Sequence, residues 1–254
     1  MLKTKVHGTT IAYERRGKGV PLMLLHGYPL DHSIWKPVSA LLEEEFDLIL
    51  PDLRGFGESD SPAGNPSMAE YAADMAGLLD QLGIQKAAIA GHSMGGYVAL
   101  AFARDFGGRV LGLGLISSQP LADSADRRTS RFQEAEHVLA QGVKDTAEGM
   151  SGRLTADAAL QGKLKELILR QRPEGLAGAL RAMAERSDMT SLITEFKFPL
   201  VIVHGLADEL IPIERAQNVK AAMPNAHLTQ IINVGHMPMM EAPNLTAEAL
   251  RVFK

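Results

Sequence analysis

Cysteine is absent from this 254-residue sequence. Its absence excludes a disulfide framework, a thiolate metal site and a cysteine nucleophile, and it leaves the redox compartment undetermined. The sequence also lacks a hydrophobic segment of membrane-spanning length, and Met1–Gly8 lacks the charged start and the apolar run of a signal peptide. We therefore expect a cytoplasmic protein with no membrane-bound part.

Neither sign of charge dominates the chain, and no basic block occurs in it. Lys and Arg total 26 against 30 Asp and Glu, which gives a net charge of −4. This balance argues against a nucleic-acid-binding surface and favours a small-molecule partner. With 46% hydrophobic and 22% charged residues, the composition is that of an ordinary globular protein, and the length favours one domain with an added segment over two equal domains.

Motifs for metal and nucleotide binding are also missing. The chain has no HExxH motif, no histidine pair at metal-ligand spacing and no phosphate-binding glycine fingerprint. Gly95 and Gly96 follow Met94, and this placement favours close helix packing over a dinucleotide-binding loop. We therefore expect neither a metal nor a cofactor.

Short apolar segments recur along the chain and predict a sheet. Leu2–His7 and Thr10–Arg15 alternate in polarity around a tight turn, which predicts an edge hairpin. Later apolar runs are typical of strands buried on both faces of a parallel sheet. They are Val20–Leu25, Phe46–Leu50, Lys86–Ala90, Val110–Ile116, Pro199–Val203 and Leu228–Ile232.

Helical segments alternate with these strands. Ser67 and Glu70 form a capping box before a run of helical periodicity, and Met94–Phe106 and Pro212–Met223 show the same periodicity. Alternation of strand and helix implies a mostly parallel central sheet with flanking helices, an α/β fold. Asn244 begins a glycosylation sequence, but without an export signal we predict that it caps a helix.

One long connection interrupts the alternation. From about Ser117 to Leu192 the sequence shows no strand pattern, and three helices are expected there: Ser124–Ala140, Asp157–Arg170 and Glu174–Arg186, with Pro173 at the start of the third. A long insertion in a compact domain often covers a site. We therefore predict core segments 1–118 and 193–254 and a helical cap, or lid, over 119–192; the alternative is a helical decoration without a role.

The pentapeptide Gly91–Gly95 has the pattern GxSxG between a predicted strand and a predicted helix. A sharp strand-to-helix turn raises a serine above the sheet edge, where a base can activate it, and flanking glycines avoid side-chain clashes. Ser93 is therefore the candidate nucleophile, and the Met94 amide at the helix start is a candidate oxyanion donor. The alternative is that glycine and serine only shape a turn.

A second oxyanion donor is expected in the loop His26–Pro29, which follows an earlier strand. Gly27 permits close backbone approach, so the Tyr28 amide is the candidate, whereas Pro29 has no N–H. We expect His26 to hold this loop by hydrogen bonds rather than to take part in chemistry.

The general base is expected late in the chain, on a loop after a strand. His236 meets this requirement, and Asp208, in the loop after the preceding strand, is the candidate acid that orients its imidazole. Glu209 is the alternative acid. His92 adjoins the nucleophile but is expected to point away from it.

These motifs resemble those of the α/β-hydrolase superfamily over nearly all of the chain except the cap. HGYP at His26–Pro29, GHSMG at Gly91–Gly95 and the glycine loop Pro51–Ser59 carry the resemblance. It implies an α/β-hydrolase fold, similar to small esterases, enol-lactone hydrolases and the cofactor-free haloperoxidase (perhydrolase) branch. In that family the glycine loop is architectural, so Asp52 and Arg54 are expected to form a local ion pair.

The resemblance separates activities as well. Haloalkane dehalogenases and epoxide hydrolases of this fold use an aspartate where this chain has Ser93, so both are excluded. The leading hypothesis is a carboxylic ester hydrolase that acts on small esters, lactones or thioesters through an acyl-enzyme on Ser93. The alternatives are a perhydrolase or lyase activity on the same triad, and a hydrolase-fold binding protein without catalysis.

Two groups of side chains are candidates for contact with the substrate. Five large apolar side chains are candidates for an acyl pocket, although each is also a candidate for the core: Trp35, Leu121, Met183, Met189 and Met237. The insertion also carries four arginines that would suit a substrate carboxylate or form a solvated face: Arg127, Arg128, Arg131 and Arg181.

Overall fold

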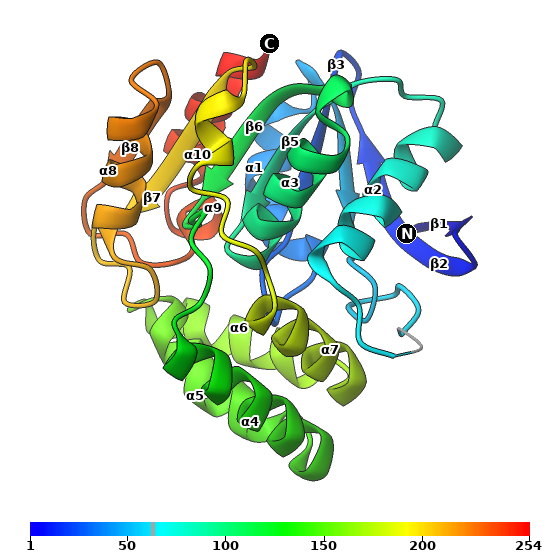
Figure 1. Ribbon diagram of the computed structural model, residues 1–254, viewed down its shortest axis with the longest axis vertical. Helices are drawn as coiled ribbons and strands as arrows, with labels where there is room; N and C mark the ends of the chain where they lie inside the picture. The colour runs from blue at the N-terminus through cyan, green and yellow to red at the C-terminus, as the bar shows by residue number, and fades with distance from the viewer. Residues whose placement is uncertain (62–63) are drawn as a thin grey trace.

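An eight-stranded sheet runs through the computed structural model, which describes residues 1–61 and 64–254 (Figure 1). The strands lie in the order β1-β2-β4-β3-β5-β6-β7-β8. Their bounds are β1 Leu2–Val6, β2 Thr9–Arg16, β3 Val20–Leu25, β4 Phe46–Pro51, β5 Ala87–His92, β6 Val110–Ile116, β7 Leu200–Gly205 and β8 His227–Ile231. All eight predicted strands are present, and their ends agree with the predicted ones to within two residues.

The first two strands form the predicted hairpin at one edge of the sheet. Leu2 lies opposite Tyr13 in the antiparallel β1–β2 pair, and β2 pairs antiparallel with β4. Every other neighbouring pair is parallel. The prediction of a mostly parallel sheet with an N-terminal hairpin is confirmed.

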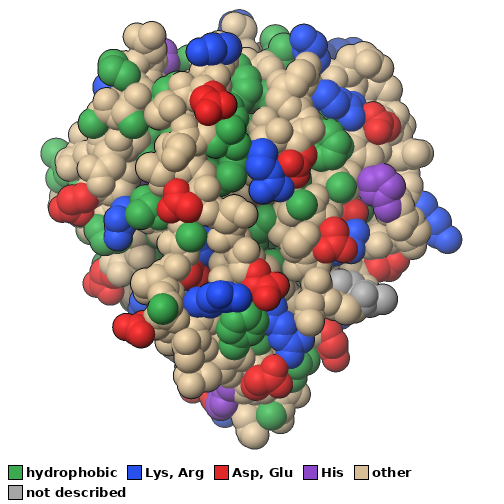
Figure 2. Space-filling model, viewed as in Figure 1, with side chains coloured by type: hydrophobic (Ala, Val, Ile, Leu, Met, Phe, Trp, Pro, Cys, Tyr) green, Lys and Arg blue, Asp and Glu red, His purple; other side chains and the backbone are tan. Residues whose placement is uncertain are grey.

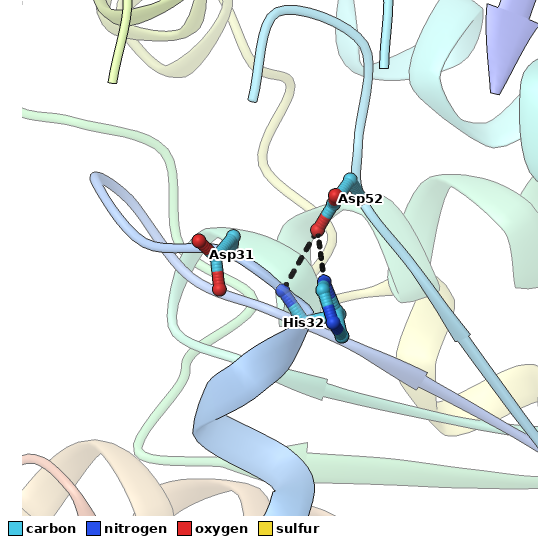
Figure 3. A group of neighbouring side chains, drawn as sticks. All are labelled: Asp31, His32 and Asp52. Atoms are coloured by element: carbon cyan, nitrogen blue, oxygen red, sulfur yellow. Dashed lines mark hydrogen bonds and ion pairs between the residues drawn. The ribbon is translucent and has the colours of Figure 1, made fainter. Parts of the chain in front are cut away.

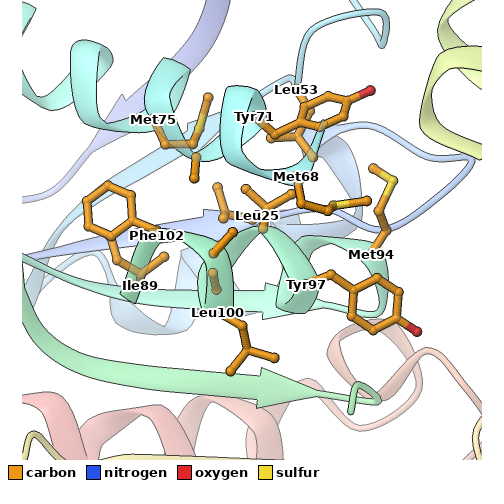
Figure 4. Close-up of a cluster of buried hydrophobic side chains, with 14 of the residues drawn as sticks. Leu25, Leu53, Met68, Tyr71, Met75, Ile89, Met94, Tyr97, Leu100 and Phe102 are labelled. Carbon is orange, nitrogen blue, oxygen red and sulfur yellow. The ribbon is translucent and has the colours of Figure 1, made fainter. Parts of the chain in front are cut away.

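Apolar side chains on both faces of the sheet explain its near-continuous hydrophobic strands. In β3, Met23 and Leu25 belong to one buried cluster while Leu22 and Leu24 belong to the other, because successive strand residues point to opposite faces. Figure 4 shows part of the first cluster, in which Phe102 packs with residues of the sheet and of the neighbouring helix.

Helices cover both faces of the sheet. Outside the segment between β6 and β7, the helices that contribute buried residues to the first cluster are α2 Met68–Gln81, α3 Met94–Asp105 and α8 Ile213–Ala222. Those that contribute to the second are α1 Lys36–Leu42, α9 Pro238–Glu241 and α10 Pro243–Leu250. Short 3₁₀ turns span His32–Trp35, Gly107–Arg109, Leu192–Glu195 and Arg251–Phe253.

The helix ends test two sequence predictions. The capping box before α2 is present, since the Ser67 amide donates to Glu70 Oε2 at 2.8 Å and the Glu70 amide donates to Ser67 Oγ at 3.2 Å. The prediction that Asn244 caps a helix is wrong. Ala242 is the N-cap of α10, Pro243 fills its first position, and Asn244 lies inside the helix.

Four helices between β6 and β7 lie together at the end of the sheet where the parallel strands finish (Figure 1). They are α4 Ala125–Gln141, α5 Lys144–Leu154, α6 Ala158–Leu169 and α7 Pro173–Ala184. Three correspond to the predicted helices, whereas α5 was not predicted. Below, the cap means residues 119–192.

The cap is fixed to the core through the glycine loop, Pro51–Ser59. The Gly57 amide donates to Gln171 Oε1 at 3.0 Å, and Arg172 Nη1 donates to the Gly57 carbonyl at 3.0 Å. Gly175 at the start of α7 lies directly against the Gly55 carbonyl, where a side chain would clash. The junction between α6 and α7 is therefore bonded to the sheet-end loop.

The charge pattern of the surface agrees with the sequence. On the face that Figure 2 shows, acidic and basic side chains are interspersed, without a patch of one sign. Among residues 1–61 and 64–254, no helix is both long enough and apolar enough to cross a membrane.

Candidate active site

Ser93 occupies a strained turn between β5 and α3. Its φ of 50° and ψ of −113° lie outside the regions that non-glycine residues normally adopt. Hydrogen bonds hold this conformation: the Ser93 amide donates to the Ile116 carbonyl at 2.9 Å, and the Ser93 carbonyl accepts from the Ser118 hydroxyl at 2.8 Å. The turn therefore matches the nucleophile elbow that the GxSxG pattern predicts.

The two glycines of this motif are required by close backbone approach. A Cβ on Gly91 would overlap the Gly95 backbone, and a Cβ on Gly95 would lie 2.5 Å from the Leu25 carbonyl oxygen. A larger residue at either position would push α3 away from the sheet. The start of α3 is thus placed directly above the strand ends, beside Ser93.

His236 and Asp208 are brought together from loops that follow β8 and β7. His236 Nδ1 lies 2.8 Å from Asp208 Oδ2, and both side chains are buried. The second carboxylate oxygen, Oδ1, accepts from the amides of Leu210 and Ile211 at 2.9 and 3.0 Å. Glu209, the alternative acid, is exposed to solvent.

The electrostatics of this pair fix the histidine tautomer. Burial alone would raise the pKa of Asp208, but the facing His236 and the two backbone amides outweigh it and lower the pKa of Asp208 to about 2. An ionised carboxylate only accepts hydrogen bonds, so Nδ1 of His236 carries the proton. Its Nε2 is left free to accept a proton from another group.

Glu241 holds the loop that carries His236, and sequence analysis did not identify it. Its carboxylate accepts from the amides on both sides of the histidine, Gly235 at 3.0 Å and Met237 at 2.9 Å, and from the Thr155 hydroxyl at 2.9 Å. The His236 amide itself donates to the Leu154 carbonyl at 3.0 Å. The loop is therefore bonded to α9 and to the end of α5 in the cap.

His92 is bonded to the loop that carries His236, the candidate base. Its Nε2 donates to the His236 carbonyl at 2.8 Å, while its Nδ1 is buried against Gly27 and has no hydrogen-bond partner in the part of the chain that the structure describes. Burial and the nearby His236 hold the pKa of His92 well below its usual range, so this ring is neutral.

The two amides expected to stabilise an oxyanion both have free N–H groups. Among the described residues, neither the Tyr28 amide nor the Met94 amide donates to a protein acceptor. His26 holds the first of these loops: its Nε2 accepts from the Leu53 amide at 2.9 Å and its Nδ1 donates to the Gly27 carbonyl at 3.0 Å. This geometry agrees with the structural role expected for His26.

Ser93 and His236 line a cavity of about 780 Å³ between the core and the cap. Tyr28 and Met183 contribute to its wall. The other apolar candidates differ from expectation and do not line it: Trp35, Leu121, Met189 and Met237. Trp35 and Met237 are fully buried in the second core cluster, which explains their hydrophobic character by packing alone.

All four arginines proposed from the sequence have acidic partners. The pairs are Arg127 with Glu134 at 2.6 Å, Arg128 with Glu185 at 3.9 Å, Arg131 with Asp123, and Arg181 with Glu136 at 2.6 Å. Their charges are thus compensated within the cap. Arg153, which the sequence analysis did not single out, also lines the cavity.

The glycine loop contains ion pairs, but not the predicted one. Asp52 Oδ1 lies 2.6 Å from His32 Nδ1, and Arg54 pairs with Asp74, 20 residues away. The expectation of an Asp52–Arg54 pair is therefore wrong. With Asp31, the first pair forms a cluster of potential metal ligands (Figure 3), but Asp52 also accepts from the His32 and Glu58 amides, so its oxygens already have donors.

Comparison with known proteins identifies related folds. The family model for the alpha/beta hydrolase fold matches residues 20–243. A thermophilic esterase from Thermogutta terrifontis, solved with malate bound, has a TM-score of 0.94 and 37% identity and covers 99% of this chain and 95% of its own. The pimeloyl-[acyl-carrier protein] methyl ester esterase of Legionella pneumophila (strain Paris) is 29% identical over 92% of this chain and 95% of its own length.

The enol-lactonase from Burkholderia xenovorans LB400 has a TM-score of 0.91 and covers 99% of both chains. Its identity is only 21%, so this likeness shows the fold alone.

Proposed function

This chain belongs to the α/β-hydrolase family, and from that membership we propose that it is a serine hydrolase that cleaves carboxylic esters, lactones or thioesters of small molecules. One observation carries the proposal. His236, buried with its Nδ1 2.8 Å from Asp208 Oδ2, lines the same cavity as Ser93 at the strained elbow. Neighbours that are themselves esterases support it.

In the proposed reaction His236 Nε2 takes the Ser93 hydroxyl proton as the oxygen attacks the ester carbonyl. A tetrahedral intermediate forms and collapses as the imidazolium gives its proton to the departing alcohol, which leaves an acyl group on Ser93. Water then attacks this acyl-enzyme with the same histidine as base, and the acid is released. Asp208 stays ionised and stabilises the imidazolium in both halves.

The oxyanion would lie against the Tyr28 and Met94 amides. Both N–H groups lack protein acceptors among the described residues, and Met94 begins α3, so the positive end of the helix dipole also favours negative charge there. One such donor typically contributes about 2.7–4 kcal/mol of transition-state stabilisation. Nucleophile, base and oxyanion donors all come from the chain, so the proposed chemistry requires no cofactor.

We assign the choice of substrate to the cap, residues 119–192, with 1–118 and 193–254 forming the core. Cap residues supply most of the cavity wall, whereas Ser93 and His236 come from the core. The cap therefore determines which acyl or alcohol group fits, and the core supplies the chemistry.

Hydrolysis of 4-nitrophenyl butyrate tests this function. We expect Ser93→Ala and His236→Ala to lower kcat by about 10⁴- to 10⁶-fold without loss of secondary structure. Ser191→Ala is the matched control because that side chain is exposed and lies outside the cavity, so its rate should equal that of wild type. A folded Ser93→Ala protein with near wild-type hydrolysis would contradict the proposal.

A further inference from the structure

Three arginines line the cavity, and they differ in how their charges are compensated. Arg127 Nη1 lies 2.6 Å from Glu134, and Arg131 pairs with Asp123. Arg153 has no ion-pair or hydrogen-bond partner within residues 1–61 and 64–254, and its side chain is exposed. Its guanidinium therefore has all five N–H donors available to a ligand.

The acidic side chains of the wall are already engaged. Asp123 also bonds Arg186 at 2.9 Å, and Asp145 accepts from His137 Nε2 at 2.7 Å. Within the described residues, no carboxylate of the cavity wall forms an ion pair with Arg153. An anion that enters the cavity therefore meets one arginine whose guanidinium is not already bonded to an acid.

Arg153 also lies close in space to the loop that carries His236. It occupies the last turn of α5, next to Leu154, whose carbonyl accepts the His236 amide at 3.0 Å. Adjacent Cα atoms are about 3.8 Å apart. The Arg153 backbone therefore lies next to the residue that is hydrogen-bonded to the His236 amide. Its side chain lines the same cavity as Ser93.

From this placement we propose that Arg153 binds a carboxylate of the substrate, so that the enzyme prefers esters that carry a second, ionised carboxyl group. Monoesters of small dicarboxylic acids, and lactones with a free carboxylate, are the corresponding class. A planar guanidinium matches a carboxylate with two parallel hydrogen bonds, a geometry that a lysine cannot reproduce. This inference rests on the proposed ester hydrolysis.

Paired substrates test it. The anionic probes are the monoethyl esters of succinate, glutarate, adipate and pimelate, and each neutral partner has an ethyl group in place of the carboxylate. A pH-stat measures kcat/KM for every pair. We expect wild type to favour the anionic ester of at least one pair, and Arg153→Met to lower that anionic-to-neutral ratio about 5- to 50-fold. Arg153→Lys should fall between them.

Arg128→Met is the matched control. It removes the same charge from the cap, which takes the net charge from −4 to −5 in both variants, but Arg128 does not line the cavity. Its ratio should stay within about twofold of wild type, and added salt should reduce the wild-type preference. An equal change of the anionic-to-neutral ratio in both variants would show that the ratio depends on the overall charge of the protein, and it would overturn the proposal.

Binding without turnover gives a second measurement. In Ser93→Ala protein, monoethyl glutarate should bind more weakly by a similar factor when Arg153→Met is added, as measured by calorimetry. Equal ratios in wild type and Arg153→Met would overturn the inference while ester hydrolysis stands. Absence of hydrolysis of every ester, with Ser93→Ala equal to wild type, would instead overturn the proposed function.

Discussion

Replacement of Asp208 by asparagine keeps the imidazole of His236 in place but changes which of its nitrogens carries the proton. Oδ1 of Asp208 accepts two backbone amides, at 2.9 and 3.0 Å, while Oδ2 faces His236 Nδ1 at 2.8 Å. In Asp208→Asn the carbonyl oxygen must face the two amides, because an NH₂ group there would oppose two donors. The NH₂ group is then forced toward His236.

An NH₂ group at that position donates to Nδ1 and selects the wrong tautomer. His236 Nε2 then carries the proton and cannot accept the one from Ser93. We expect kcat for 4-nitrophenyl butyrate to fall about 10⁴-fold, equivalent to roughly 5 kcal/mol of transition-state stabilisation. Steady-state assays at neutral pH measure kcat, and circular dichroism is the control for folding.

The same substitution has a signature in stability. The pKa of Asp208 is lowered to about 2 from an ordinary value of 3.8, so its ionised form stabilises the fold above pH 4 by an amount on the order of 2 kcal/mol. This contribution is lost as pH falls through about 2. Asp208→Asn should remove that acid dependence. A folded Asp208→Asn protein that keeps more than about a tenth of wild-type kcat would refute the reasoning.

Three further outcomes follow from the site. His92 is buried and neutral with a lowered pKa, so the free energy of unfolding should decrease as pH falls below about 6.5, and thermal melts of His92→Asn should show a weaker dependence. Glu241→Gln loses one of two acceptors beside His236, so kcat should fall by up to about 100-fold with an altered pH–rate profile, whereas unchanged kinetics would exclude a positioning role. Met183→Ala should shift kcat/KM among acyl chain lengths about 10- to 200-fold, and Leu121→Ala, outside the cavity, should leave the profile parallel to wild type.

Local pattern was sufficient to predict most of the sheet and to find the residues that the structure brings together at the candidate site. Strands buried on both faces have a nearly continuous apolar sequence, and the nucleophile elbow requires glycines at fixed positions around Ser93. His236 and Asp208 could be placed because each follows a recognisable strand. These features depend on neighbours within a few residues, which the sequence displays directly.

Features that depend on distant contacts were missed or misplaced. Helix α5 contains Gly149 and Gly152, whose low helix propensity conceals it, and packing within the cap must stabilise it. Arg54 finds its partner in Asp74, and the loop of His236 is held by Glu241 and the cap. Neither spacing nor composition reveals such pairings, because they arise only when the chain has folded.

The central claim is that Ser93 is the activated nucleophile, and a covalent serine probe tests it most directly. A fluorophosphonate should add once to the wild-type protein, and peptide mapping by mass spectrometry should place the adduct on Ser93. The adduct should be absent from Ser93→Ala and should form far more slowly in His236→Ala, since the base activates the hydroxyl. An adduct on another residue, or equal labelling of the Ser93→Ala protein, would contradict the account.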